Sequence, residues 1–267
     1  MSRVRALLAK DLADLRQNPG VFVPAVLTSC IALALPFIVA IVVPAVFGEG
    51  LADSGDLDLA REMYRTRPAA RALDADGAIQ AWVFERFLVL LALSPVAASM
   101  SVAAYSVIGE KQARTLEPLL ATPITTVELV AAKVLASFVP ALTLAAAVFG
   151  CYLAGIQVFA RPGVARTLLA PQPLAVMLLL TPLASLASLQ LAVCASARAN
   201  DARSAQQIGS LIVLPLGGLL VLQLMGAFEL TAMTLMAMAI GLAALNAALM
   251  WISVVVFDRE SILTRWK

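Results

Sequence analysis

Long runs of apolar residues, interrupted by short charged segments, dominate the chain. Six stretches contain no Asp, Glu, Lys or Arg: residues 17–48, 87–109, 134–160, 167–197, 204–228 and 230–257. Each exceeds the roughly 20 residues that a helix needs to cross a hydrocarbon core about 30 Å thick. The runs lack the alternation of polar and apolar positions that is typical of a membrane barrel. We therefore expect an all-α membrane protein with six transmembrane helices.

The composition also excludes an ordinary soluble domain. Apolar residues make up 61% of the chain and charged residues 13%, whereas about a quarter of the residues are charged in typical soluble domains. The net charge of +2 is too small to indicate a nucleic-acid partner, so the lipid bilayer is the expected surrounding. No internal repeat and no low-complexity linker occurs, which predicts a single membrane domain over residues 1–267.

Residues 2–17 carry a helical apolar stripe before Asn18-Pro19-Gly20 ends the pattern. This pattern predicts an elbow helix that lies in the inner interface plane; a short soluble helix in front of the membrane is the alternative. Prolines at 24, 36 and 44 predict that the first span is not a straight rod. An outer loop is expected over residues 48–81, with a short surface helix over residues 58–66. Trp82 and Phe84 would then form an aromatic belt at the outer interface.

The distribution of basic residues predicts the orientation. With the N-terminus in the cytoplasm, twelve lysines and arginines lie in inner segments and seven arginines in outer segments. All four lysines then lie inside. The positive-inside rule favours this arrangement, so both termini are expected to be cytoplasmic.

Several kinds of chemistry are excluded by the residues that the chain lacks. It contains no histidine, which removes His-based zinc sites, His proton relays and Ser-His or Cys-His catalysis. Cys30, Cys151 and Cys194 lie in different spans and predict neither a disulfide nor a metal cluster. The phosphate-loop pattern G-x-x-x-x-G-K-[ST] does not occur, so this chain is not expected to bind ATP or to be an enzyme.

A charged loop with two prolines, over residues 110–128, separates the second and third spans. The second span should continue past Gly109 as a helix, with Glu110 and Arg114 in the favourable i,i+4 order. Pro118 and Pro123 then limit its continuation. Thr125 and Glu128 have capping-box spacing and should start the third span. Apolar side chains in this loop need burial, either in the groove of a partner or on the bilayer surface: Leu116, Leu119, Leu120 and Ile124.

From Glu110 to Lys133 the chain reads E-K-Q-A-R-T-L-E-P-L-L-A-T-P-I-T-T-V-E-L-V-A-A-K. This closely resembles the cytoplasmic loop of permeases of the ABC type-2 exporter superfamily, which usually reads E-K-E-x-G-T-L-E-x-L-L-x-T-P-[IV]-[ST]-x-x-E-L-x-x-x-K. Gln112 and Arg114 depart from the usual glutamate and glycine. The segment K-D-L-A-D-L-R from Lys10 to Arg16 is similar to the sequence pattern of the elbow helix in the same permeases.

The resemblance implies a function and partners. The chain would be the permease of an ATP-driven exporter in a prokaryotic plasma (inner) membrane, with ATP and Mg bound by a separate ATPase. Two permeases, as a homodimer or as a heterodimer with a similar permease, would meet two ATPase copies. A coupling helix in the loop would touch the ATPase, and a re-entrant hairpin between spans five and six becomes an option. The implied ATPase-coupling residues are Glu110, Lys111, Arg114, Thr115, Leu116, Glu117, Leu119, Leu120, Thr122, Pro123 and Ile124.

Polar residues are rare inside the predicted spans. Gln190, Gln223 and Asn246 are candidates to line a translocation path; interhelical hydrogen bonds are the alternative. The uncharged spans favour an apolar or amphipathic cargo. The alternative function is an ion-coupled secondary transporter or channel-like protein, but the uncharged runs contain no carboxylate or histidine for ion coupling.

Overall fold

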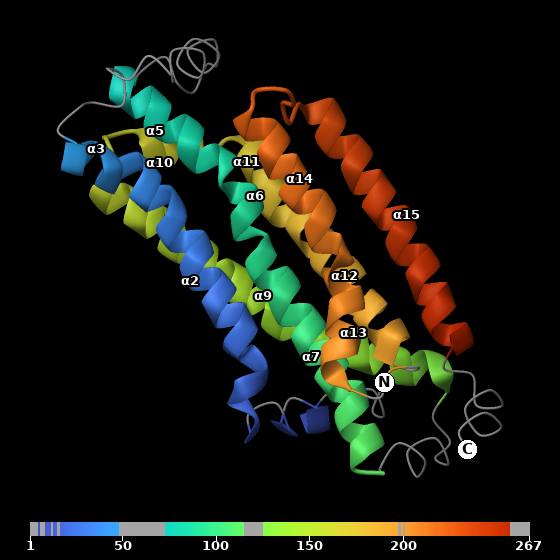
Figure 1. Cartoon of the computed structure of the whole chain (residues 1–267). Coiled ribbons are helices and arrows are strands. Elements are labelled where there is room, and N and C mark those ends of the chain that lie inside the picture. Colours follow the sequence, from blue (N-terminus) through green and yellow to red (C-terminus); the bar gives the residue numbers. More distant parts are fainter. Residues whose placement is uncertain are drawn as a thin grey trace.

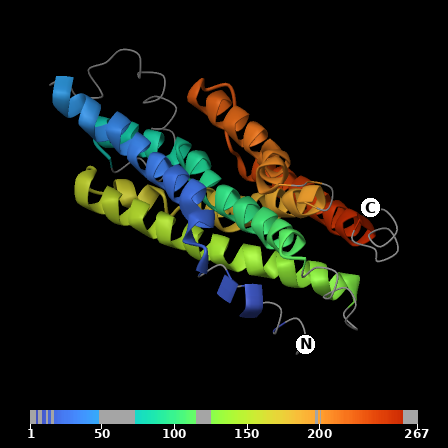
Figure 2. The same ribbon diagram turned by 60° about the horizontal axis from the view of Figure 1, so that its bottom comes forward.

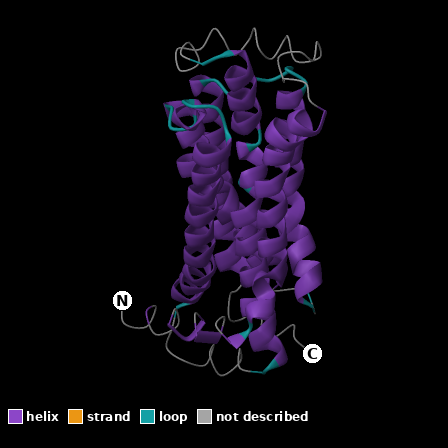
Figure 3. Cartoon of the chain, turned by 90° about the vertical axis from the view of Figure 1, so that its left-hand side faces the viewer, coloured by secondary structure: helices purple, strands orange, loops and turns teal. Residues whose placement is uncertain are grey.

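The fold was examined in a computed structural model of the chain. It describes residues 5, 9–11, 13–14, 17–47, 73–114, 125–196, 199 and 201–256. Every regular element in these ranges is a helix, and six helical stretches are long and apolar enough to cross a membrane. The predicted all-α fold with six spans is confirmed (Figure 3). The described residues before Asn18 are helical, but an interfacial position for them stays a prediction.

Several spans consist of more than one helical segment. The first joins η1 (Pro19–Phe22), α2 (Val23–Phe37), the π-helical η2 (Ile38–Val42) and α3 (Val43–Phe47). The second joins α5 (Ala75–Arg86), α6 (Leu88–Leu91) and α7 (Leu93–Gln112), and the third is α9 (Thr126–Phe159). After α10 (Val164–Thr167), the fourth joins α11 (Pro171–Ala175), the π-helical η6 (Val176–Leu180) and α12 (Thr181–Ser196). The fifth joins α13 (Ala202–Gly209), η7 (Ser210–Ile212) and α14 (Val213–Leu224), and the sixth is α15 (Ala232–Val256).

The π-helical turn η2 lies between Pro36 and Pro44, as expected where prolines disturb the regular hydrogen-bond ladder of a helix. The connection between the fifth and sixth spans is a turn over residues 225–231, in which Gly226 has a φ of 69°. A re-entrant hairpin is therefore not present there. The helix α5 begins at Ala75, so the last residues of the expected outer loop 48–81 are helical. The expected helix over residues 58–66 lies outside the described residues.

Spans two and four form the centre of the bundle. In each span we compared the buried share of an apolar 18-residue window. This share is 83% in the second span and 67% in the fourth, against 17–28% in the other four spans. The helix α7 packs against α2, α9, α12 and α13, and α12 also packs against α15 (Figure 1). Figure 2 shows α9 running along the whole bundle below α2 and α7. The four peripheral spans therefore keep broad apolar faces for lipid or for another protein.

Successive spans run in opposite directions (Figure 1). The start of α2, the end of α7, the start of α9, the end of α12, the start of α13 and the end of α15 consequently share one end of the bundle. We call this the loop end, because residues 113–125 connect two spans there. The α14–α15 turn lies at the opposite end.

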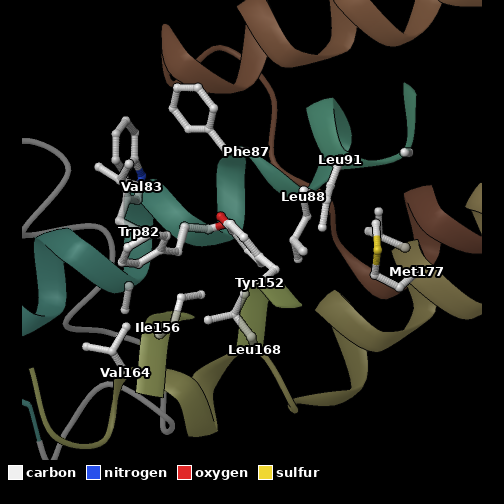
Figure 4. Packing of buried hydrophobic residues seen from close by; sticks show 14 of the residues in the cluster. Trp82, Val83, Phe87, Leu88, Leu91, Tyr152, Ile156, Val164, Leu168 and Met177 are labelled. Atoms are coloured by element: carbon white, nitrogen blue, oxygen red, sulfur yellow. The ribbon is translucent and has the colours of Figure 1, made fainter. Parts of the chain in front are cut away.

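A compact apolar core lies toward that opposite end, between α5, α6, α9 and α10 (Figure 4). Tyr152 of α9 is fully buried, and its hydroxyl donates a hydrogen bond to the Phe84 carbonyl oxygen at 2.9 Å. The Phe37 ring packs against both residues, with centroid distances of 5.1 Å to Phe84 and 5.7 Å to Tyr152. Trp82 and Phe84 are buried, so the prediction that they form an aromatic belt is wrong. They are buried because α5 packs against η2 and α10 in this core.

Candidate coupling site at the loop end

The residue that starts α9 is fixed by a capping box. The Thr125 hydroxyl oxygen accepts a hydrogen bond from the Glu128 backbone N–H at 3.2 Å. The Glu128 carboxylate accepts one from the Thr125 backbone N–H at 2.9 Å. The predicted capping box is confirmed. It fixes the residue at which the chain enters the bundle again as α9.

The helix α7 ends at Gln112, earlier than the expected pair of Glu110 and Arg114 requires. Ala113 and Arg114 form a turn, and Arg114 has a φ of 54°, in the left-handed region. The helical i,i+4 arrangement of Glu110 and Arg114 is therefore absent, and that prediction is wrong. Glu110 instead turns toward lysines that come from other parts of the chain.

A charged cluster of Lys10, Asp11, Glu110 and Lys133 lies between the N-terminal segment, α7 and α9. The Lys133 ammonium lies 2.8 Å from a carboxylate oxygen of Glu110 and 3.6 Å from one of Asp11. It also donates hydrogen bonds to the Ser106 carbonyl oxygen at 3.2 Å and to the Ser106 hydroxyl at 3.0 Å. Lys10 forms an ion pair with Glu110. Three segments that are distant in sequence thus meet at one lysine.

Burial distinguishes the members of this cluster. Lys133 is 2% exposed, Asp11 6% and Glu110 7%, whereas the Lys10 side chain is 43% exposed. Burial raises the pKa of Asp11, and the positive charge of Lys133 only partly offsets this effect. Burial alone would lower the pKa of Lys10, but the hydrogen bond and the charge of Glu110 outweigh it and raise that pKa. The carboxylate of Asp11 is therefore held by the fold in a place that disfavours its charge.

A cavity of about 270 Å³ opens beside the cluster, between the N-terminal segment and the last turns of α7. Its wall includes Asp14, Asn18 and Tyr105 in addition to three members of the cluster. Because Lys10, Asp11 and Glu110 line this cavity, one side of the charged cluster borders a space large enough for water. Lys133 is not among the lining residues and lies behind them.

A further contact ties α7 to the connection between the fourth and fifth spans. The Lys111 ammonium donates a hydrogen bond to the Ala199 carbonyl oxygen at 2.8 Å. Two residues later Asp201 caps α13, because its carboxylate accepts a hydrogen bond from the Ser204 backbone N–H at 2.8 Å. The end of α7 is therefore attached to the N-terminal segment, α9 and the residues before α13.

Only part of the predicted coupling set can be located. Glu110 is buried, Lys111 is partly buried and Arg114 is exposed. The remaining coupling residues lie outside the described part of the chain: Thr115, Leu116, Glu117, Leu119, Leu120, Thr122, Pro123 and Ile124.

The predicted path residues are buried inside one chain. Gln190 is 3% exposed, Gln223 1% and Asn246 6%. The Asn246 amide donates hydrogen bonds to the Leu183 carbonyl oxygen at 3.0 Å and to the Leu242 carbonyl oxygen at 2.8 Å, which joins α15 to α12. Asn246 thus makes the interhelical contact that was the alternative. A role of the three residues in a translocation path stays a prediction.

Sequence reasoning did not assign a role to Lys133 or to Asp11. Lys133 lies 23 positions from Glu110, and Asp11 lies about 100 positions from it, so no local periodicity connects them. The available signal was chemical: Lys133 is the only basic residue of a long apolar helix, α9. Such a charge needs a buried partner.

Comparison with known proteins agrees with this architecture. The family model described as "ABC-2 type transporter" matches residues 3–225, which include the N-terminal segment, the loop and the first five spans. No curated protein and no solved structure matches the chain significantly. Because the family match covers most of the sequence, the chain belongs to the ABC-2 type transporter family and is a multi-pass membrane permease.

Proposed function

We propose that this permease couples ATP hydrolysis by a separate ATPase subunit to the export of an apolar or amphipathic substrate. The observation that carries the proposal is the fixed base of the loop over residues 110–128. The loop leaves α7 beside a buried ion pair and enters α9 through a capping box. A force on the loop would therefore reach two spans directly.

The contact with the ATPase is assigned to the apolar residues of the loop. Leu116, Leu119, Leu120 and Ile124 lie between charged residues and need a partner surface for burial. The ATPase of the family supplies the corresponding groove in this proposal, and it binds ATP and Mg, because this chain lacks a phosphate loop. Binding of ATP at the partner would shift the permease between inward-open and outward-open states.

We further propose that two permeases form the transport unit with two ATPases. The fifth span supports this proposal, because Leu214 is 70% exposed and Val221 54% exposed on α14. A Cβ atom added at Gly217 or Gly218 would meet no atom of this chain within 4 Å. An open apolar face with paired glycines suits close approach of a helix from a second copy or from a similar permease.

The loop end is assigned to the cytoplasmic side of a prokaryotic plasma membrane. Arg86, Arg161 and Arg166 belong to the end opposite the loop, whereas Lys10, Lys111 and Lys133 belong to the loop end. The positive-inside rule supports cytoplasmic termini on this count.

The coupling assignment is tested by replacing Leu119 and Leu120 together with Asp. We expect normal membrane insertion, loss of ATPase co-purification and loss of ATP-dependent transport, because two carboxylates cannot enter an apolar groove. The matched control replaces both residues with Met, which keeps the apolar surface and volume and should retain the ATPase. Unchanged ATPase binding and transport in the Asp variant would refute the assignment.

A further inference from the structure

The resemblance assigns Glu110 to the contact with the ATPase, but its surroundings indicate an internal role. Only 7% of Glu110 is exposed, and its carboxylate faces two lysines of the same chain. Lys133, the buried one of these two lysines, is 2% exposed and also reaches Asp11 and Ser106. A partner protein could touch little of either side chain.

We propose that Lys133 is a positioning residue that joins the N-terminal segment, the end of α7 and the start of α9 into one rigid unit. Within this unit Lys133 and Glu110 hold α7 on α9, and Asp11 and Lys10 hold the N-terminal segment on both helices. The role of this rigid unit in transport rests on the proposed coupling function. The rigid unit itself forms without a partner protein.

The energetics of the cluster favour positioning over simple stabilisation. Removing two charges from water is costly, and an apolar set of similar volume is often as stable as a buried ion pair. An ion pair nevertheless allows one arrangement of its members, because any shift leaves a buried charge without its partner. Such a cluster therefore suits the base of the loop over residues 110–128, where α7 and α9 must keep their relative positions when a partner moves the loop.

The attachment of the N-terminal segment to α9 and the attachment of α7 to α9 can be measured separately. Ala13 on the N-terminal segment, Gln112 at the end of α7 and Val127 at the start of α9 are exposed and can carry spin labels. Cysteine labels at 13 and 127 report on the segment against α9, and labels at 112 and 127 report on α7 against α9. The native residues Cys30, Cys151 and Cys194 are free and are first replaced by Ala.

Distances would be measured by pulsed electron paramagnetic resonance on the full-length permease alone in lipid nanodiscs. We expect narrow distributions for both label pairs in the parent protein. Lys133→Met should broaden both about twofold, since an unattached short helix frays readily. Lys10→Ala together with Asp11→Ala should broaden only the 13–127 distribution, because Lys133 and Glu110 still hold α7 on α9.

Charge reversal separates an ionic role from a steric one. The variant with Lys10→Glu, Asp11→Lys, Glu110→Lys and Lys133→Glu exchanges the sign of every member and keeps all three pairs. It should restore narrow distributions, and Arg203→Met, which removes an exposed charge at the same end, should leave them narrow. If Lys133→Met does not fold, the Lys10 and Asp11 double variant and the reversed set still decide the question.

Narrow distributions for both label pairs in folded Lys133→Met, or a narrow 13–127 distribution in the Lys10 and Asp11 double variant, would overturn the proposal. Failure of the fully reversed set to narrow the distributions would also overturn it. Since no ATPase takes part in these measurements, such a result leaves the proposed coupling function standing. Loss of ATPase binding by the loop variants would, in turn, say nothing against the rigid unit.

Discussion

Burial decides what each charge at the loop end contributes. Lys10 and Lys133 both pair with Glu110, but the Lys10 side chain is 43% exposed and that of Lys133 only 3%. Exposed pairs contribute about 0–1 kcal/mol, whereas removing one partner of a buried pair costs about 3–5 kcal/mol. Lys133 and Glu110 are consequently the residues of this cluster whose loss the fold tolerates least.

Asp11 leads to a prediction about pH. Its pKa is raised above the ordinary value of 3.8, so its protonated form favours folding. That contribution is fully present below pH 3.8 and is lost as the pH rises through the raised pKa. At pH 7 the ionised carboxylate therefore disfavours the fold, and Asp11→Asn should show equal or higher thermal stability in detergent than the parent protein.

The advantage of Asp11→Asn should shrink as the pH falls and Asp11 of the parent becomes protonated. Melting curves of both proteins between pH 4 and pH 7 would measure it. Asp14→Asn, which changes an exposed carboxylate of the same segment, is the control. A difference in melting temperature between Asp11→Asn and the parent protein that grows toward low pH would contradict the prediction.

At the scale of elements, the sequence predicted the number of spans but began the second span too late. The uncharged run 87–109 lies within the helical stretch Ala75–Gln112, whose first turns belong to the expected outer loop 48–81. The helical turns before this run contain Arg86, which lies 3.6 Å from Glu229 in the folded chain. A criterion based on absence of charge ends a helix at such a residue, because its partner is distant in sequence. The start of the third span was predicted instead from the capping box of Thr125 and Glu128.

Local signals were reliable where the interaction itself is local. The capping box of Thr125 and Glu128 spans three residues, and the proline near η2 acts on its own helix. The charged cluster, in contrast, depends on packing between elements that are distant in sequence. It has no signature within a short window of sequence.

Packing of α2 on α9 depends on a glycine and gives a second prediction. A Cβ atom at Gly155 would lie 2.7 Å from the Phe37 ring, which is held by Phe84 and Tyr152. Gly155→Ala should therefore destabilise the protein by about 1–3 kcal/mol through overpacking. Gly150 lies on the same helix with nothing within 4 Å of an added Cβ atom, so Gly150→Ala should be neutral or stabilising by up to about 1 kcal/mol.

Thermal denaturation in detergent measures both glycine variants. Adding Phe37→Leu to Gly155→Ala should recover part of the loss, since the smaller side chain leaves room for the methyl group. Equal melting temperatures for the two alanine variants would show that Phe37 moves aside without cost, contrary to the prediction.

At the scale of the whole molecule, the orientation can be tested by labelling single cysteines. Residues near Asp56 and Glu229 should react with an impermeant reagent from outside the cell. Residues near Arg114, Arg203 and Arg265 should react only after permeabilisation, because the basic end of the bundle is expected in the cytoplasm. The reverse pattern would invert the assigned orientation of all six spans.

The central claim is that a separate ATPase drives this permease, and reconstitution tests it most directly. The permease would be purified alone, and also after co-expression with candidate ABC ATPase subunits of its source cell, and ATP hydrolysis would be measured in nanodiscs. We expect no hydrolysis by the permease alone and steady hydrolysis by a stable complex, because this chain lacks a phosphate loop and its family implies an ATPase partner. Hydrolysis by the permease alone, or absence of any stable complex with the ATPase, would contradict the claim.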